Sequence, residues 1–118
     1  MEFRAFDAEK DKEAATRIWR EIGWVDGEET VKAMHLFLSG ARVFVTDIDD
    51  EPECLVASLQ GDMRYLSETL PLSVVASVTT SRIARKQGLA GHMAAELIAA
   101  DAADGAAVST LGIFEQGF

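Results

Sequence analysis

Hydrophobic residues recur along this chain at two spacings, one typical of helices and the other of strands. Residues 2–6 alternate polar and apolar positions and predict a short strand. Asp7 suits a helix cap, and the apolar stripe that follows it predicts a helix. A second stripe predicts another helix, which begins with the capping-box pattern Asp26-x-x-Glu29 and ends at Gly40. The two stripes are Ala14, Ala15, Ile18, Trp19 and Ile22, and then Val31, Met34 and Leu38.

Three strands are predicted in the middle of the chain. The segments ARVFVTDI (41–48) and CLVASLQG (54–61) are rich in apolar residues, and the acidic DDEPE between them (49–53) is typical of a turn. Together they predict a β-hairpin. Residues 62–70 are expected to form a loop. The next segment, LPLSVVASV (70–78), carries no charge and predicts a strand that is buried on both faces.

The last part of the chain predicts one helix and one strand. Leu89, Met93 and Leu97 repeat every fourth position in a helix over 88–104, and AAVSTLGIF (106–114) reads as a strand. The predicted order is therefore β-α-α-β-β-β-α-β, an α/β class with a mixed sheet. Because a strand-helix-strand crossover joins the last two strands, we expect them to pair in parallel.

Composition narrows the class of protein. The 118 residues are 48% apolar and 26% charged, which predicts one folded domain over residues 1–118. The formal net charge of −9 argues against general binding to nucleic acid and against docking on an anionic membrane. The charged N-terminus does not resemble a secretory signal, so the expected compartment is the cytoplasm. The single cysteine, Cys54, excludes an internal disulfide and is expected to be a buried structural thiol.

One basic segment stands out against this acidic background. RIARKQGLAG (82–91) carries Arg82, Arg85 and Lys86, and no Asp or Glu occurs from residue 69 to residue 95. The segment joins the carboxyl end of a strand to the start of a helix, the place where open α/β sheets bind ligands.

A helix start offers unpaired N–H groups and a positive dipole, and Gly88 has no Cβ to block a ligand. These features predict a site for phosphate or diphosphate. A plain connector with solvated cations is the alternative on the residues alone. The segment matches neither the Walker A loop nor the dinucleotide-binding fingerprint.

The hexapeptide RKQGLA (85–90) fits the pattern [Q/R]-x-x-G-x-[G/A] and, with the strand before it and the helix after it, resembles the acetyl-CoA diphosphate loop of the GNAT superfamily of N-acetyltransferases. The order of the elements resembles that family along nearly the whole chain. The segments VTTSRIARKQGLAG and LGIFEQGF look most like the bacterial enhanced intracellular survival acetyltransferases, which are longer proteins.

This resemblance implies acetyl-CoA as cosubstrate and gives roles to particular positions. The backbone of residues 78–80 would bond the pantetheine arm, amides from residue 86 to residue 91 would hold the diphosphate, and the end of the last strand would border the reactive end. The residues so implied are Val78, Thr79, Thr80, Arg85, Lys86, Gln87, Gly88, Leu89, Ala90, Gly91, Phe114 and Glu115. The implied reaction is direct transfer of acetyl to an amine, either on a small molecule or on a lysine side chain.

The chain departs from the family pattern after Phe118, where family members commonly continue with a tyrosine that serves as general acid, a fourth helix and two more strands. We therefore expect the N-terminal part of a larger domain, truncated before its last helix and strands and incomplete for catalysis. Tyr65, in a predicted loop, is a poor substitute. A sheet left open at its last strand could also pair in a homo-oligomer.

Other polar and aromatic residues have simpler explanations. His35 and Trp24 are expected to pack, although Trp24 lies where the family often binds its acceptor, and His92 is expected at the surface. The acidic residues Asp47, Asp49, Asp50, Glu51 and Glu53 lack the spacing of a calcium loop and are expected to form a solvated turn rather than a metal site.

Three functions remain open on the sequence. The first is a GNAT-type N-acetyltransferase, for which the acidic surface favours cationic amines. The second is a non-catalytic module for CoA binding or oligomerisation. The third is a different α/β protein that binds a phosphate ligand.

Overall fold

The computed structural model describes residues 2–111 and has the order of elements that the hydrophobic pattern predicts. The elements are β1 (Glu2–Ala5), α1 (Lys12–Glu21), α2 (Glu28–Ser39), β2 (Arg42–Ile48), β3 (Glu51–Tyr65), β4 (Glu68–Thr80), the 3-10 turn η1 (Arg82–Ala84), α3 (Leu89–Ala103) and β5 (Val108–Leu111). The predicted last strand (106–114) runs past the described residues, so only its first part can be compared.

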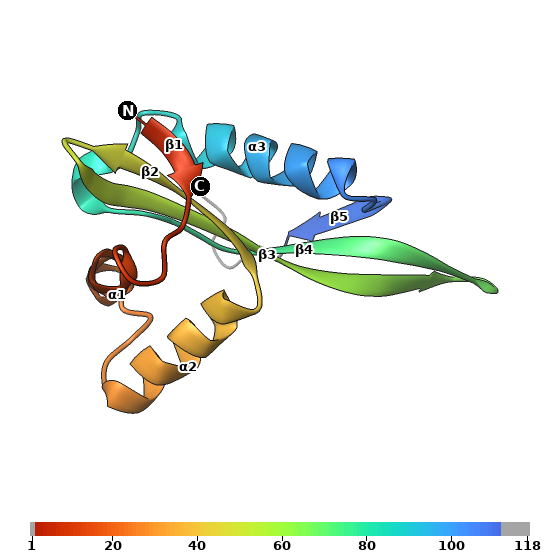
Figure 1. Ribbon diagram of the computed structural model, residues 1–118, viewed down its shortest axis with the longest axis horizontal. Coiled ribbons are helices and arrows are strands. Elements are labelled where there is room, and N and C mark those ends of the chain that lie inside the picture. The colour runs from red at the N-terminus through yellow and green to blue at the C-terminus, as the bar shows by residue number, and fades with distance from the viewer. Residues whose placement is uncertain (1, 112–118) are drawn as a thin grey trace.

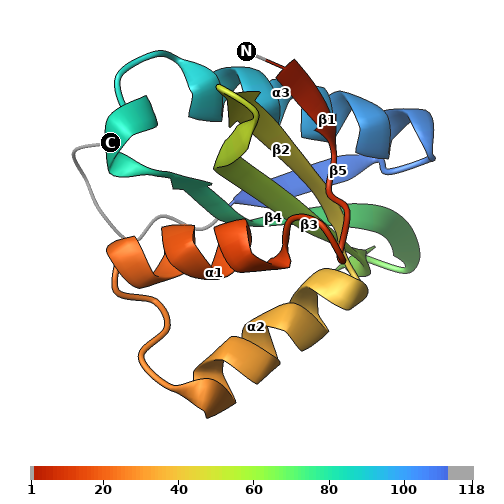
Figure 2. The same ribbon diagram turned by 60° about the vertical axis from the view of Figure 1, so that its left-hand side comes forward.

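The strands form one mixed sheet in the order β1-β2-β3-β4-β5. Neighbouring strands are antiparallel from β1 to β4, whereas β4 and β5 are parallel. The parallel pair confirms the prediction from the strand-helix-strand crossover. Helix α3 covers one face of the sheet, and α1 and α2 cover the other (Figure 1; Figure 2).

Two hydrophobic clusters fill the spaces between these layers. On one face, Ile18 and Trp19 of α1 pack against Leu55 of β3. On the other face, Met93 and Leu97 of α3 pack against the strands. Successive β3 side chains point to opposite faces, so this strand contributes to both clusters. This two-sided burial explains why β3 is continuously apolar at its centre.

The prediction of a loop over residues 62–70 is wrong. Strand β3 continues to Tyr65, and β4 begins at Glu68, so a two-residue turn joins them and Leu66 has a left-handed φ of 57°. The two strand ends form a ribbon that projects beyond the helices (Figure 1). Asp62, Met63, Arg64 and Tyr65 alternate polar and apolar positions, which is the strand signal that the polar composition of the segment obscures.

The acidic turn is also shorter than predicted. Strand β2 ends at Ile48 and β3 begins at Glu51, so only Asp49 and Asp50 form the turn, with φ of 52° and 66°. Positive φ at both central residues is what the common two-residue hairpin turn requires, and aspartate tolerates it better than most residues. Pro52 lies inside β3.

Both helix starts differ from the predicted ones. Asp7 begins a turn, in which its carboxylate accepts the N–H groups of Glu9 and Lys10, and α1 starts only at Lys12. At α2 the capping residue is Gly27, whose N–H donates to the hydroxyl of Thr30 at 3.1 Å. The predicted pair of Asp26 with Glu29 is therefore one position early.

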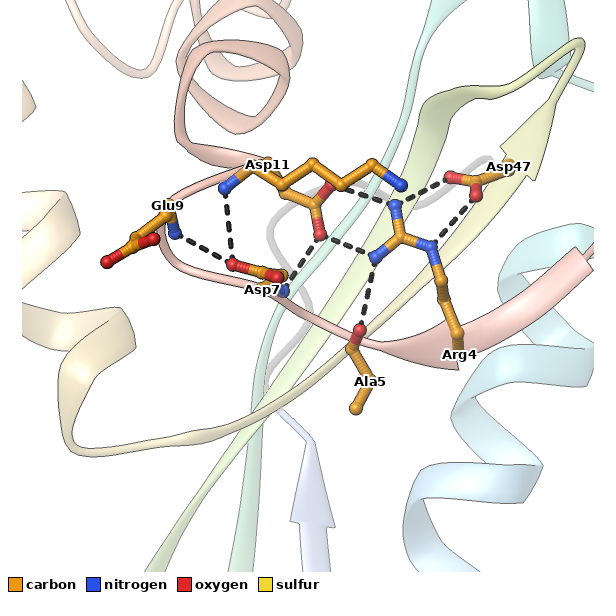
Figure 3. Close-up of polar contacts among 7 residues, drawn as sticks. Arg4, Ala5, Asp7, Glu9, Asp11 and Asp47 are labelled. Carbon is orange, nitrogen blue, oxygen red and sulfur yellow. Dashed lines mark hydrogen bonds and ion pairs between the residues drawn. The ribbon is translucent and has the colours of Figure 1, made fainter.

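A cluster of charged side chains links β1 to α1 and β2 through ion pairs (Figure 3). The guanidinium of Arg4 donates to Asp11 at 2.6 and 2.8 Å and to Asp47 at 2.8 and 3.1 Å. Asp11 is almost completely buried at the start of α1, and Asp47 is buried in β2. Arg4 thus joins an edge strand, a helix start and a second strand. The hydrogen bond from Arg4 lowers the pKa of Asp11 and outweighs the opposite effect of burial.

We predict that this cluster gives the fold part of its acid sensitivity. The pKa of Asp11 is lower in the folded chain than in the unfolded chain. Its contribution to the free energy of unfolding is therefore present above about pH 4 and is lost as the pH falls through the folded value. Arg4→Met should cost about 2–3 kcal/mol at pH 7, because it leaves buried carboxylates without their partner.

Urea unfolding at pH 7 and at pH 3 measures both effects. Asp11→Asn should lose less stability between the two values than the wild type does, whereas Glu28→Gln, an exposed control, should behave like the wild type. An Asp11→Asn variant with the full acid dependence of the wild type would contradict the assignment.

Candidate functional site

The carboxyl half of β4 is bent by an extra residue. Leu55 of β3 pairs with Thr79, but Ala57 pairs with Ala76, so β4 has one residue more than β3 over this interval. Ser77 lies within the bulge and has a φ of 58°. Such a bulge re-aims the strand that carries it. Pairing with β5 over the described residues ends at Val75, before the bulge.

Val78, Thr79 and Thr80, to which the family resemblance gives the pantetheine arm, follow this bulge. Thr79 is buried and its hydroxyl donates to the carbonyl of Leu55 at 3.4 Å, while Val78 and Thr80 are half-buried. Among residues 2–111, no strand pairs with this part of β4 on the side away from β3. As far as the described part of the chain goes, this backbone edge is open to an extended partner.

The chain then leaves the sheet through an exposed turn. The turn η1 is followed by Arg85, Lys86, Gln87 and Gly88, which are all exposed. Lys86 and Gly88 both have left-handed backbones, with φ of 65° and 73°. These two positions let the chain reverse its direction in a few residues before α3 begins at Leu89. We call residues 85–91 the basic turn.

The start of α3 has backbone donors without partners. The first hydrogen bond of the helix runs from the N–H of His92 to the carbonyl of Gly88 at 3.1 Å, and no side chain caps the helix. Within residues 2–111 the N–H groups of Leu89, Ala90 and Gly91 therefore donate to nothing. They lie at the positive end of the helix dipole and suit an anion.

Cations precede these donors closely in the sequence. Arg82, Arg85 and Lys86 are exposed, and none of them forms an ion pair with a carboxylate among the described residues. A Cβ built on Gly88 would meet no atom within 4 Å, so space next to its backbone is open. The residues of the basic turn therefore fit a diphosphate in charge, donors and room.

Buried side chains hold the turn on both sides. Ala84 precedes the exposed residues and is 1% exposed, and Leu89 follows them and is 6% exposed. Both pack in the same cluster as Met93, whose sulfur accepts a hydrogen bond from the hydroxyl of Thr46. The basic turn is therefore held on both sides by residues packed in the core, as a preorganised binding site requires.

Several other candidates have structural roles. His35 lies beside Trp19, and its Nε2 is 2.8 Å from the hydroxyl of Thr16. Because that hydroxyl donates to the carbonyl of Lys12, His35 donates from Nε2. Burial lowers the pKa of His35 and favours its neutral form. Burial likewise raises the pKa of Cys54, as expected of a structural thiol.

Of the remaining candidates, the described residues include His92 and Trp24. His92 is exposed, as predicted, and its ring lies edge-on to Phe3. Trp24, expected to pack in the core or at an interface, is 42% exposed and so does not pack in the core, whereas packing at an interface stays a prediction. Phe114 and Glu115 lie outside the described residues.

The acidic cluster is not one solvated turn, as the sequence predicted. Asp49, Asp50 and Glu51 are exposed, but Asp47 and Glu53 are buried and pair with arginines. The arginine partners, Arg4 and Arg17, are distant in the sequence, so composition alone gave no signal for them. Over residues 2–111 no three Asp, Glu, His or Cys side chains are arranged to hold a metal ion. In the same part of the chain no helix has the length and apolarity needed to span a membrane.

Solved structures share this fold. A probable N-acyltransferase from Enterococcus faecalis V583 superposes with a TM-score of 0.83 over 97% of this chain and 29% of its own length, at 18% identity. A predicted acetyltransferase from Clostridium acetobutylicum, solved with acetyl-CoA, gives 0.77 over 95% of this chain and 80% of its own, at 13% identity. A GNAT family acetyltransferase from Staphylococcus aureus gives 0.76 over 99% and 90%, at 13% identity.

No protein-family model and no curated protein matches the sequence. At these low identities the structural likeness establishes the fold alone. Over residues 2–111 the mixed five-stranded sheet with its three helices matches the folds of these solved structures, one of which is a GNAT family acetyltransferase.

We predict that the two glycines of the basic turn respond oppositely to alanine. Gly88→Ala should cost about 1 kcal/mol, because its φ of 73° disfavours a side chain although no atom is in the way. Gly91→Ala should stabilise by up to about 1 kcal/mol, since Gly91 lies inside α3 and is equally uncrowded. Chemical denaturation measures both, and equal shifts in the two variants would contradict the left-handed backbone at Gly88.

Proposed function

We propose that the chain binds acetyl-CoA through the basic turn and serves in transfer of the acetyl group to an amine. The observation that carries this proposal is the set of N–H groups at Leu89, Ala90 and Gly91, which have no partner in the described chain and stand among exposed cations. A diphosphate has the charge and the acceptor oxygens that such a set requires.

The binding of a whole CoA molecule follows from the order of sites along the chain. The diphosphate would lie on the basic turn, and the pantetheine arm would run along Val78, Thr79 and Thr80 as an added strand. The bulge at Ser77 bends β4 just beyond Val75, its last described pair with β5. Gln87 would border the diphosphate, and Phe114 and Glu115 are proposed to border the reactive end.

The proposed transfer has four chemical requirements, one met by the cosubstrate and three by the protein. When bound, acetyl-CoA supplies an acetyl thioester that an uncharged amine attacks. The protein must remove a proton from that amine, stabilise charge on the thioester oxygen and return a proton to the leaving thiolate. The single tyrosine, Tyr65, is 60% exposed at the far tip of the β3–β4 ribbon and does not serve as the acid. We therefore assign no catalytic residue.

The acceptor is proposed to be a cationic amine, on a small molecule or a lysine, because the chain has a net charge of −9. The narrower resemblance to enhanced intracellular survival acetyltransferases, the cytoplasmic location and the homo-oligomer stay predictions from the sequence. The position of Tyr65 favours one alternative, which is a module that binds CoA or mediates assembly without catalysing transfer.

We predict that Gly88→Asp weakens CoA binding at least about tenfold, because its carboxylate would enter the open space beside the turn and repel the diphosphate. Gly105→Asp is a matched control: Gly105 also has a positive φ, 109°, and open surroundings, but it lies beyond the other end of α3. Calorimetric titration with CoA should show normal affinity for that control. Equal CoA affinity in Gly88→Asp and wild type would remove the basic turn as the site.

Turnover distinguishes the enzyme from the binding module. If the proposal holds, the chain releases CoA from acetyl-CoA faster in the presence of polyamines, aminoglycosides or a lysine peptide than in their absence. Free thiol is measured with a chromogenic disulfide, and Gly88→Asp should abolish the increase. Binding of CoA without any amine-dependent release of thiol would favour the non-catalytic module.

A further inference from the structure

A buried glutamate contacts the segment that connects β4 to the basic turn. Glu53, near the start of β3, is 4% exposed. One oxygen of its carboxylate accepts a hydrogen bond from Arg17 of α1 at 2.7 Å, and the other accepts one from the hydroxyl of Ser81. The same arginine nitrogen also donates to the carbonyl of Pro52 at 2.9 Å. Glu53 thus connects α1 to the residue that directly follows β4.

The backbone of Ser81 reinforces this connection. Its N–H donates to the carbonyl of Glu53 at 2.7 Å, and its carbonyl accepts the N–H of Ala84 at 3.1 Å, which closes the turn η1. Ser81 itself is completely buried. It therefore makes the last backbone hydrogen bond to the sheet before the basic turn, and beyond it Ala84 and Leu89 hold the two ends of the turn by packing.

We propose that Glu53 is a positioning residue, which holds the basic turn in its binding geometry through Ser81. This inference rests on the proposed function, because it assigns Glu53 to the same cofactor site. Binding a diphosphate requires several N–H groups to point at the same group of oxygens. A small displacement of the turn therefore weakens all of these hydrogen bonds together. Neither Glu53 nor Ser81 needs to touch the ligand.

An ordinary structural role for Glu53 is the competing explanation, and β4 contains its control. Near the middle of the strand the hydroxyl of Ser73 donates at 2.5 Å to Asp101, and Asp101 lies 3.2 Å from Arg42. Ser73 and Asp101 are as buried as Ser81 and Glu53. The two clusters have the same chemistry, but only that of Ser81 adjoins the basic turn.

The test compares Ser81→Ala with Ser73→Ala. Each variant removes one hydroxyl from a buried carboxylate, so both should lose stability. We expect Ser81→Ala to weaken CoA about tenfold while its affinity for pantetheine, which has no diphosphate, stays near that of the wild type. Ser73→Ala should bind both compounds normally. Calorimetric titration at a temperature where both variants are folded provides the four affinities.

A second measurement does not depend on CoA. Backbone ¹⁵N relaxation should report lower order parameters over residues 82–88 in Ser81→Ala and unchanged ones in Ser73→Ala. If Ser81→Ala does not fold, Ser81→Cys replaces it, with Ser73→Cys as its control, because a thiol nearly keeps the shape of the hydroxyl but donates only weakly. Ser81→Cys should weaken CoA more than pantetheine, whereas Ser73→Cys should bind both compounds normally, and equal affinities in the two variants would overturn the positioning role.

Each outcome decides one claim. Wild-type protein that binds CoA, together with Ser81→Ala that binds it equally well and keeps an ordered turn, would overturn the positioning role alone. Equal weakening of CoA and pantetheine in Ser81→Ala would also overturn it, because a merely structural loss affects both. Wild-type protein that binds neither compound would overturn the proposed function and this inference with it.

Discussion

The opening turn of α3 sets the constraint on which the proposed site depends. A helix cannot satisfy its own first N–H groups, and here no side chain caps them among the described residues. The left-handed backbone at Gly88 brings the chain into the helix without covering these donors. Met93 and Leu97, completely buried against the sheet, hold the helix in place. The donors are therefore fixed in space and have no hydrogen-bond partner among the described residues.

The distribution of charge supports this arrangement. The chain is acidic, yet several of its carboxylates are buried and are paired with arginines that join separate elements. Arg4 holds β1 to α1 and β2, Arg17 holds α1 to β3, and Arg42 joins β2 to Asp101 and Asp104 at the end of α3. Such pairs fix geometry more than they add stability. Among the described residues, the carboxylates that form ion pairs do so with these arginines and not with the basic turn, so the cations of the turn remain for a ligand.

Sequence periodicity predicted the order of elements and the parallel pair, because long apolar stripes and a crossover connection leave few alternatives. The periodicity gave wrong element boundaries where contacts between distant parts of the chain determine the local structure. Asp7 and Asp11 are both plausible at a helix start, and the contact of Asp11 with Arg4 belongs to the fold rather than to local sequence. The ribbon tip at Leu66 lacks the glycine that usually marks a tight hairpin.

Only the part of the candidate site that is built from neighbouring residues could be predicted from the sequence. Local residues alone located the basic turn, since glycine, cations and a helix start are adjacent in sequence. The bulge at Ser77 has no glycine to signal it, and the burial of Glu53 depends on Arg17, which is 36 residues away. Charge in a hairpin usually indicates a solvated turn, and only the structure reveals the internal pairing.

A crystal structure of the chain with CoA tests the central claim most directly. The account predicts that diphosphate oxygens lie within about 3 Å of the N–H groups at the start of α3, with Gly88 in contact and the pantetheine arm beside β4. CoA bound elsewhere on the molecule, or side chains closed over the basic turn in its place, would contradict the account.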